Sequence, residues 1–414
     1  MMKKKVTMFV WNEFTNDARV LRECTALHNA GYQVVLIALR GNQNKLEKPL
    51  DYFYVRRIRF DWPAPRNFWT KLLILFGWGI VAFFWPLIGI ILVMAWFLIY
   101  QTKCGSLLKK LIQILEMTYW GAVTQTDIYH ANDLNTLFQA VICAKWLKRK
   151  PLIFDSHEVN LSRTGYNAAY YGIAEKWLLR FVDECIHENH TRAKFIRRVY
   201  GFYPSVIYNY PFLSDESTVP YDLHEKLNID KSEPILLYQG GLQSGRGLEK
   251  LIDAVPLIKR GVVVFLGDGR LENELKEQVK KLELQKRIKF LPKVPVTELP
   301  RYTKSAYLGI QLLNNTCFNH FSAASNKLFE YMMAGVPIVA CSFPEIRKVV
   351  MKEKIGIVVQ SDNVTSIAEG INEMLDHPEL RDEMSKNALR VRNHYSWEKE
   401  QERFLQIYQG LVKE

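Results

Sequence analysis

An uncharged run is the feature that most constrains this chain. From Leu72 to Tyr100 there are 29 consecutive residues without a charged side chain, LLILFGWGIVAFFWPLIGIILVMAWFLIY. A transmembrane helix requires about 20 predominantly apolar residues, so this run is long enough to enter a bilayer. The length and composition of the run therefore indicate contact with a membrane.

The charges beside the run determine the topology that we expect for it. Basic residues flank it on both sides, at Arg66, Lys71, Lys103, Lys109 and Lys110. Because Lys and Arg at membrane ends favour the cytoplasmic side, both ends are expected on that side. Two full crossings need about 40 residues, whereas a helix broken near Pro86 can enter the bilayer and return. We predict a re-entrant hairpin at residues 72–100, inside an insert at 62–117; a buried helical hairpin or a dimer interface is the alternative.

The charge and the cysteine content limit the kinds of binding partner and site that we expect. Lys and Arg number 55 against 43 Asp and Glu, a net charge of +12 that favours nucleic acid, an anionic membrane surface or phosphorylated ligands. We expect no nucleic-acid partner, because no recognisable nucleic-acid-reading module is present. The basic series Arg192, Lys194, Arg197 and Arg198 either faces anionic headgroups or forms a solvated helix face. The six cysteines are scattered without a Cys-x-x-Cys pair, so we expect free thiols in a reducing cytoplasm and no metal site.

Outside the insert, short β-branched runs alternate with amphipathic helical stretches. This alternation is typical of βαβ units and parallel sheets, so the predicted fold class is α/β. Residues 6–11 and 34–39 are expected strands, and Asp17 is expected to cap the helix between them. A second series begins at ILLYQ, after a polar linker near 211–233. We predict domains at 1–211 and 212–393, followed by a closing helix at 394–414.

The glycine-rich segment LLYQGGLQSGRGLEKLI lies between an expected strand and helix. Its first two glycines are Gly240 and Gly241, and Arg246 stands between two further glycines. Glycines allow backbone N–H groups to approach an anion at a helix N-terminus, and Arg supplies a forked cationic donor. The spacing resembles a P-loop, but the lysine and the magnesium-binding hydroxyl residue are absent, which disfavours an NTPase. The segment is a phosphate cradle or, as the alternative, a plain tight turn.

The segment FSAASNKLFEYMMAGVPIVA, residues 321–340, offers both anion donors and a carboxylate. Ser325 is expected at a helix N-terminus, Lys327 in its first turn and Glu330 three residues later. A nucleoside diphosphate needs both kinds of group, because its phosphates require cations and its ribose hydroxyls can donate to a carboxylate. The alternative is a solvated helix start in which Lys327 and Glu330 form an i, i+3 pair.

These motifs together resemble a known family. YQGGLQSGRGLEKLI, FLGDGRLENEL, SNKLFEYMMAGVPIVA and the two-domain layout are similar to retaining family 4 glycosyltransferases of the GT-B fold. The resemblance covers nearly the whole chain outside the insert. It implies two Rossmann-like domains that face each other across a cleft, an N-terminal one for the acceptor and a C-terminal one for the nucleotide sugar. It also implies a UDP- or GDP-sugar as the donor substrate and no other cofactor.

The resemblance also implies roles for individual residues. Glu330 matches the second glutamate of the family's paired motif and would hold the ribose, while Arg246 would bind the diphosphate. His157 in FDSHE matches the histidine that contacts the donor sugar or its phosphate. With Lys327, these residues are the expected catalytic set. The expected donor-binding set is Gly240, Gly241, Gly267, Ser322, Ser325 and Asn326.

Two positions depart from the family pattern. Ser322 stands eight residues before Glu330, where the first glutamate of the pair is usual, so the acidic contact to the sugar hydroxyls is absent. Gly241 stands where an arginine often follows the first glycine of the donor loop. The identity of the sugar is therefore open.

The expected reaction follows from the charge that must be stabilised. Breaking a sugar–diphosphate bond leaves negative charge on the diphosphate, and no Asp-x-Asp motif is present in the sequence to recruit a metal for it. We predict metal-independent transfer, with the retention of configuration that the resemblance implies, to a lipid-linked or other glycan acceptor at the cytoplasmic face of the cell membrane. Surface polysaccharide or glycolipid assembly would use such a step. A catalytically inactive GT-B scaffold or partner subunit, and a sugar-nucleotide epimerase of the same fold, are the alternatives.

Overall fold

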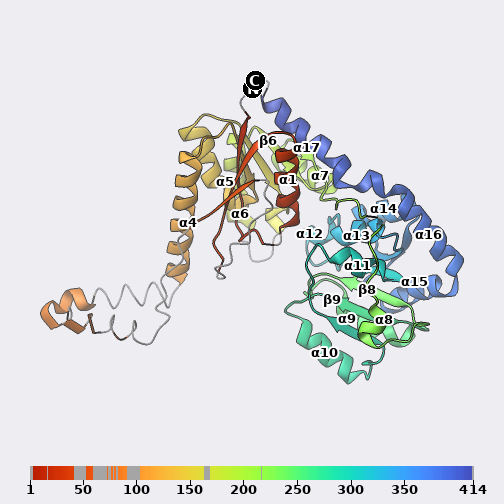
Figure 1. Cartoon of the computed structure of the whole chain (residues 1–414). Helices are drawn as coiled ribbons and strands as arrows, with labels where there is room; N and C mark the ends of the chain where they lie inside the picture. The colour runs from red at the N-terminus through yellow and green to blue at the C-terminus, as the bar shows by residue number, and fades with distance from the viewer. Residues whose placement is uncertain are drawn as a thin grey trace. The chain divides into compact units, whose positions relative to one another are not determined.

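The computed structural model describes residues 3–15, 17–41, 53–58, 72, 76–77, 79–80, 83–90, 103–162, 168–215 and 217–412. The chain divides into two compact units (Figure 1). The first consists of Met1–Asp155 with Leu178–Glu184, and the second of Ser156–Trp177 with Cys185–Glu414.

The first sheet has seven strands in the order β3-β2-β1-β4-β5-β6-β7. The strand order reverses between β1 and β4, as in doubly wound α/β folds. Every residue of β4 and β5 is buried, which is typical of parallel strands that are covered on both faces. The strands are β1 (Lys5–Phe9), β2 (Gln33–Ala38), β3 (Tyr54–Arg57), β4 (Ile128–Asn132), β5 (Leu152–Ser156), β6 (Glu184–His187) and β7 (Ser205–Val206).

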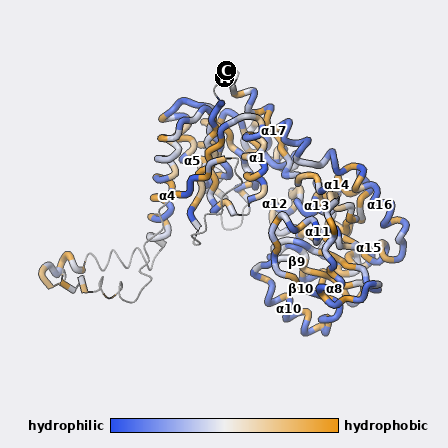
Figure 2. Tube along the Cα trace, in the orientation of Figure 1, coloured by the Kyte–Doolittle hydropathy of each residue, from blue (hydrophilic) through white to orange (hydrophobic). Residues whose placement is uncertain are grey.

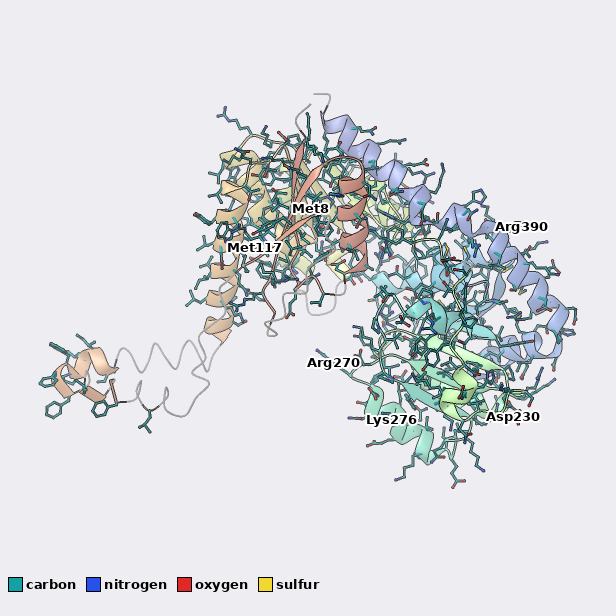
Figure 3. The ribbon with its side chains drawn as sticks, in the orientation of Figure 1. Met8, Met117, Asp230, Arg270, Lys276 and Arg390 are labelled. Carbon is teal, nitrogen blue, oxygen red and sulfur yellow. The ribbon has the colours of Figure 1, made fainter. Side chains whose placement is uncertain are left out.

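Helices cover both faces of this sheet near β1. Successive strand side chains point to opposite faces: Met8 contacts Cys24 of α1 (Ala18–Asn29), and Phe9 lies against Gly121 of α4 (Lys103–Val123). Figure 3 labels Met8 in β1 and Met117 in α4, both fully buried. The other helices between strands of this sheet are α5 (Leu134–Val141), the π-helix η1 (Ile142–Leu147), η2 (Asn160–Ser162), α6 (Ala168–Leu178), η3 (Leu179–Phe181) and α7 (His190–Tyr200).

The second sheet has six strands in the order β10-β9-β8-β11-β12-β13, and its order reverses between β8 and β11. In such sheets ligands bind at the carboxyl ends of the strands beside the reversal. The residues that follow β8 are therefore an expected place for a ligand. The strands are β8 (Ile235–Gln239), β9 (Val262–Leu266), β10 (Ile288–Leu291), β11 (Leu308–Gln311), β12 (Ile338–Cys341) and β13 (Gly356–Val359).

Two apolar cores lie on the two faces of the second sheet. Alternate residues of β8 divide between them, since Leu237 belongs to one core and Leu236 to the other. Figure 2 shows the strands as hydrophobic tube segments between more hydrophilic helices. The helices of this part are α8 (Leu223–Leu227), α9 (Leu248–Ala254), η4 (Val255–Leu257), α10 (Glu272–Lys281), α11 (Leu299–Lys304), α12 (Phe318–Phe321), α13 (Asn326–Met333), α14 (Pro344–Glu353), α15 (Val364–Asp376), α16 (Pro378–Val391), η5 (Arg392–Tyr395) and α17 (Trp397–Val412).

The α/β class with parallel sheets is confirmed. The expected linker near 211–233 contains the short helix α8. The predicted membrane hairpin at 72–100 falls largely outside the described residues. Among the helices that the structure describes, none is long and apolar enough to cross a membrane, so the apolar insert gains no support here. The domain boundary at residue 211 and the cleft between the domains stay predictions.

Candidate functional site

Two glycines cross closely at the carboxyl end of β8. Gly240 has a φ of +121° and donates its N–H to the carbonyl of Leu266 at 2.9 Å. Gly267 follows β9 with a φ of +153°, and a Cβ there would lie 2.0 Å from the Gly240 carbonyl oxygen. A side chain at Gly267 would displace the Gly240 turn, so glycine is required by the close approach. The structure therefore brings the predicted donor residues Gly240 and Gly267 together.

Lys327 lies against this turn. A Cβ on Gly240 would be 2.6 Å from Lys327 Cε, and Lys327 is only 8% exposed. Burial, and then the charge of Arg246, lowers the pKa of Lys327 to about 7, while Glu330 opposes this effect. Within the described part of the chain, no salt bridge joins Lys327 to a carboxylate. The site thus places a buried lysine near a second cation, with no carboxylate of the described residues in salt-bridge contact with Lys327.

Arg246 is held by two glycines with positive φ. Gly245 has a φ of +80° and Gly247 a φ of +71°, and a Cβ on Gly247 would lie 2.3 Å from the Leu312 carbonyl oxygen. Arg246 Nε is buried and has no hydrogen-bond partner among the residues described. An unsatisfied buried donor is costly, and such a group commonly signals a ligand that completes it. The turn therefore fits an anion better than a plain tight turn.

Glu330 is positioned from the neighbouring strand. Gln239 Nε2 donates to Glu330 Oε2 at 2.6 Å, and Gln239 Oε1 accepts from Thr303 Oγ1 at 2.8 Å. Glu330 is half-buried, and its carboxylate has lone pairs left for further donors. This arrangement fits a carboxylate that accepts hydrogen bonds from vicinal hydroxyls.

The start of α13 has the predicted form. Ser325 is the N-cap residue in extended conformation, and its hydroxyl makes no capping hydrogen bond. Asn326 is exposed, and its Oδ1 accepts from Asn209 Nδ2 at 3.0 Å. Lys327 follows in the first turn, but no ion pair to Glu330 is found among the described residues. The structure therefore does not show the alternative i, i+3 ion pair between Lys327 and Glu330.

Unlike the Ser325 hydroxyl, which makes no capping hydrogen bond, the Ser322 hydroxyl is already hydrogen-bonded within the protein. It is fully buried, donates from Oγ to the Phe318 carbonyl oxygen at 2.7 Å and accepts from Arg192 Nε at 3.3 Å. Its hydroxyl is therefore engaged by its own helix and by α7. A donor-binding role for Ser322, like one for Gly241, stays a prediction.

Arg192 connects segments that are distant in sequence. It is 4% exposed and donates to Glu188, to the carbonyl oxygen of His157 and to that of Asn319. The idea that it faces lipid headgroups was wrong for Arg192, because its guanidinium is buried; Lys194, Arg197 and Arg198 are exposed. Arg192 instead fixes the loop that carries His157, which is half-buried.

A second histidine adjoins the cations. His320 in α12 lies against Gly245, where a Cβ would be 2.7 Å from His320 Cε1, and its Nδ1 is 2.9 Å from Thr316 Oγ1. Burial, and then the charge of Arg246, lowers the pKa of His320, which favours the neutral imidazole. Sequence reasoning missed His320, Arg192 and Gln239, because a lone polar residue in an amphipathic stretch carries no signal of its partners.

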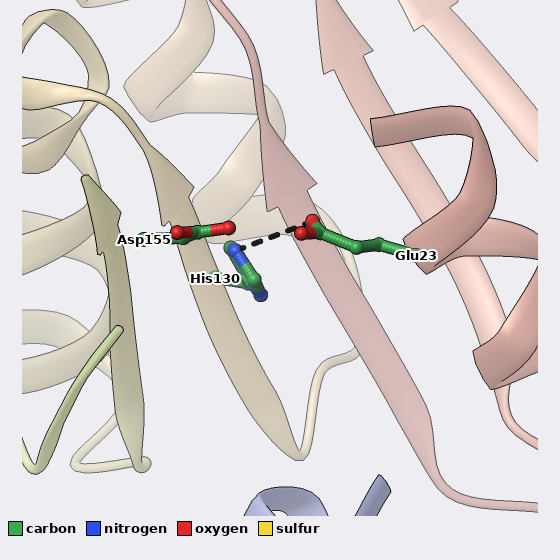
Figure 4. A group of neighbouring side chains, drawn as sticks. All are labelled: Glu23, His130 and Asp155. Atoms are coloured by element: carbon green, nitrogen blue, oxygen red, sulfur yellow. Dashed lines mark ion pairs between the residues drawn. The ribbon is translucent and has the colours of Figure 1, made fainter. Parts of the chain in front are cut away.

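The first unit contains a separate polar cluster. Glu23, His130 and Asp155 converge from α1, β4 and β5, with candidate ligand atoms within 4.8 Å of one another (Figure 4). Arg19 donates to both oxygens of Asp155, at 2.8 and 3.0 Å, and lies 3.0 Å from Glu23. A guanidinium between the carboxylates already supplies the positive charge that a metal ion would bring. We assign the cluster to a buried charge network, and the absence of a metal site stays a prediction.

Comparison with known proteins agrees with this geometry. Residues 221–391 match the family Glycosyl transferases group 1. An uncharacterized glycosyltransferase of Methanocaldococcus jannaschii is 25% identical over 305 residues, which cover 69% of this chain and 76% of that protein.

Solved structures with a similar fold match nearly the full length of the chain. The sucrose-phosphate synthase of Thermosynechococcus elongatus matches with a TM-score of 0.75 at 16% identity, covering 99% of this chain and all of that one. Anabaena HepE in complex with UDP and glucose matches with a TM-score of 0.72 at 14% identity, covering 98% of this chain and all of that one. The fold is a two-domain, GT-B-like α/β fold. The segment 221–391 is a group 1 glycosyl transferase domain, and the protein is a glycosyltransferase.

Proposed function

We propose that this protein is a retaining family 4 glycosyltransferase that moves a sugar from a UDP- or GDP-sugar to a lipid-linked glycan acceptor, without a metal ion. The observation that carries the proposal is the buried Lys327 beside Gly240 and Arg246. A diphosphate would satisfy the ammonium, the orphaned Arg246 Nε and the end of α13 together.

Each part of the donor has a matching group in the site. The diphosphate binds at the Gly240 and Gly241 turn between Lys327 and Arg246, with Ser325 and Asn326 at the helix end. The ribose hydroxyls donate to Glu330, whose other hydrogen bond comes from Gln239. Anabaena HepE binds UDP and UDP-glucose, which supports testing UDP-sugars first.

The reaction replaces one bond to the anomeric carbon with another. The bond from the sugar C1 to the diphosphate oxygen breaks, and the acceptor hydroxyl oxygen bonds to C1 on the same face. The acceptor's proton passes to the departing phosphate oxygen, so no side-chain nucleophile is required. Lys327 and Arg246 stabilise the charge that develops on the diphosphate. The His157 carbonyl accepts from Arg192, which holds the loop that carries the histidine. In this proposal the His157 side chain contacts the donor sugar or its phosphate.

The uncharged run 72–100 supports a position at the cytoplasmic face of the cell membrane. A membrane-attached enzyme and a lipid-linked acceptor both diffuse in the plane of the same membrane, so they meet there. Surface polysaccharide or glycolipid assembly uses acceptors of this kind. The proposed partners are therefore a nucleotide sugar, a glycan on a lipid carrier and the bilayer itself.

The test is a transfer assay on the full chain reconstituted in vesicles that contain lipid extract. Radiolabelled UDP- and GDP-sugars are supplied one at a time in EDTA, and label in the lipid fraction is measured. We expect transfer from one donor class with the donor's anomeric configuration, lost in Lys327→Met and kept in the exposed control Lys250→Met.

Other outcomes separate the alternatives. An inverted product would contradict retention, and a requirement for divalent metal would contradict metal independence. An altered sugar nucleotide without transfer would indicate an epimerase. Absence of any transfer by a chain that still binds nucleotide would favour the scaffold.

A further inference from the structure

A continuous apolar stripe runs along α4 in the first unit. Its members recur every four residues and are 52–64% exposed in the described part of the chain, at Leu107, Leu111, Leu115, Tyr119 and Val123. Residues four apart are about 40° apart around a helix, so the five side chains cover an arc of about 160° that is centred on Leu115. Exposed apolar stripes of this length are uncommon on proteins that contact water alone.

The opposite face of α4 accounts for its attachment to the fold. Met117 is fully buried and accepts from Gln139 Nε2, while Gly121 is buried and lies against Phe9. Leu115, at the centre of the stripe, and Tyr119 are each two residues from Met117, a turn of about 200°, so the middle of the stripe points away from the face that holds Met117. Packing on the sheet is thus complete without the stripe.

The segment that precedes α4 in the sequence indicates what covers the stripe. Gln101 and Thr102 alone separate the uncharged run 72–100 from α4, and three residue steps span at most about 11 Å. If the run enters a bilayer, the first turn of α4 must lie at the bilayer surface. If a protein partner covered the stripe instead, the short distance between α4 and the uncharged run would have no role.

The charges of α4 match anionic headgroups. The helix contains Lys103, Lys109 and Lys110, all in its first eight residues, against the single acidic residue Glu116. Lys110 is exposed beside Leu111. Helices that lie in a membrane interface combine a leucine-rich face with lysines that reach the headgroups.

We propose that α4 lies in the plane of an anionic membrane surface, with its apolar stripe in the outer acyl region. This inference rests on the proposed membrane attachment through residues 72–100 and adds a second, extended contact. The helix would fix how the first unit is oriented on the bilayer, which attachment by a hairpin alone would leave free to rotate.

The test measures depth at three positions of α4 in the full chain. An environment-sensitive fluorophore is attached to Leu107→Cys, Leu115→Cys or Val123→Cys, in vesicles of phosphatidylcholine and phosphatidylglycerol. Nitroxide lipids labelled at different depths then quench it. Leu257→Cys, at a 52% exposed site of the second unit, is the matched control, and the unsubstituted chain gives the background from native cysteines.

We expect shallow quenching at all three α4 positions, strongest at position 115 in the middle of the arc and similar at positions 107 and 123 at its two edges, and none at position 257. The substitutions Leu111→Gln and Leu115→Gln together should lower the quenching at position 123 severalfold, whereas Leu257→Gln should not. A graded depth from 107 to 123, which differ by about 24 Å along the axis, would show that α4 stands across the bilayer and would overturn the proposal.

Flotation of the same vesicles distinguishes two failures. If the chain floats but no α4 position is quenched, the stripe is covered by protein, and the α4 proposal fails while membrane attachment stands. If the chain does not float, the proposed attachment through 72–100 fails as well. Nucleotide binding by the second unit is independent of either result.

Discussion

At the scale of the residue, Lys327 links stability to pH. Its folded pKa of about 7 is below its ordinary value of 10.5, so the folded state binds fewer protons between these values. The cost of burying the ammonium is fully present below pH 7 and disappears as pH rises toward 10.5. Lys327→Met should therefore stabilise the free protein by a few kcal/mol at pH 7 and by little near pH 10. Thermal unfolding at both pH values measures this.

The control for that prediction is an exposed lysine. Lys250 in α9 is exposed and has no resolved interaction with the site. Lys250→Met should change the unfolding temperature by the same small amount at both pH values. Equal gains for Lys327→Met at pH 7 and pH 10 would mean that its ammonium is not buried in solution.

Glu330 provides a second residue-scale prediction. If its carboxylate accepts from the ribose, Glu330→Gln should weaken binding of the preferred nucleoside diphosphate by about 10- to 100-fold, because hydrogen bonds to charged groups contribute about 1.5–3 kcal/mol. The 2′-deoxy analogue should lose much less. Titration calorimetry of both nucleotides against both proteins measures the coupling. Equal losses for the two nucleotides would place Glu330 away from the ribose.

At the scale of the element, the crossing of the β8 and β9 ends should tolerate no side chain. Gly267→Ala adds a Cβ 2.0 Å from the Gly240 carbonyl oxygen at a φ of +153°. We expect the unfolding temperature to fall by about 4–10 °C and nucleotide binding to be lost with it. Gly410→Ala is the control, since its Cβ would meet nothing within 4 Å on α17. An unchanged nucleotide affinity in Gly267→Ala would show that the turn is not part of the site.

Sequence patterns predicted elements better than the contacts between them. The strand at Val6–Trp11 is observed at Lys5–Phe9, and Asp17 caps α1 by accepting from Val20 N, as expected. These features are local, because alternation and capping depend on neighbouring residues. The π-helix η1 was not predicted, because apolar periodicity indicates a helix but does not report the wider turn at its end.

At the scale of the whole molecule, the candidate site residues of the second unit come from separate parts of the sequence. Gly240, Arg246, Lys327 and Glu330 were predicted from two motifs, whereas Arg192 and His320 were not. Arg192 meets His157 and Ser322 across 35 and 130 residues. Contacts of this range are set by strand order and helix packing, which hydrophobic periodicity cannot report. The cluster of Glu23, His130 and Asp155 was missed for the same reason.

The proposed function requires that the site around Lys327 binds a nucleoside diphosphate without metal. Calorimetric titration of the full chain with UDP, GDP and ADP in EDTA, at pH 7 and pH 8, tests it most directly.

We predict that one nucleotide binds selectively and that its binding takes up protons, because the diphosphate raises the pKa of Lys327. Affinity should fall by up to about tenfold from pH 7 to pH 8. It should be abolished in Lys327→Met and kept in Lys250→Met. Binding of no nucleotide, or binding that requires added divalent metal, would contradict the proposed metal-independent nucleotide site.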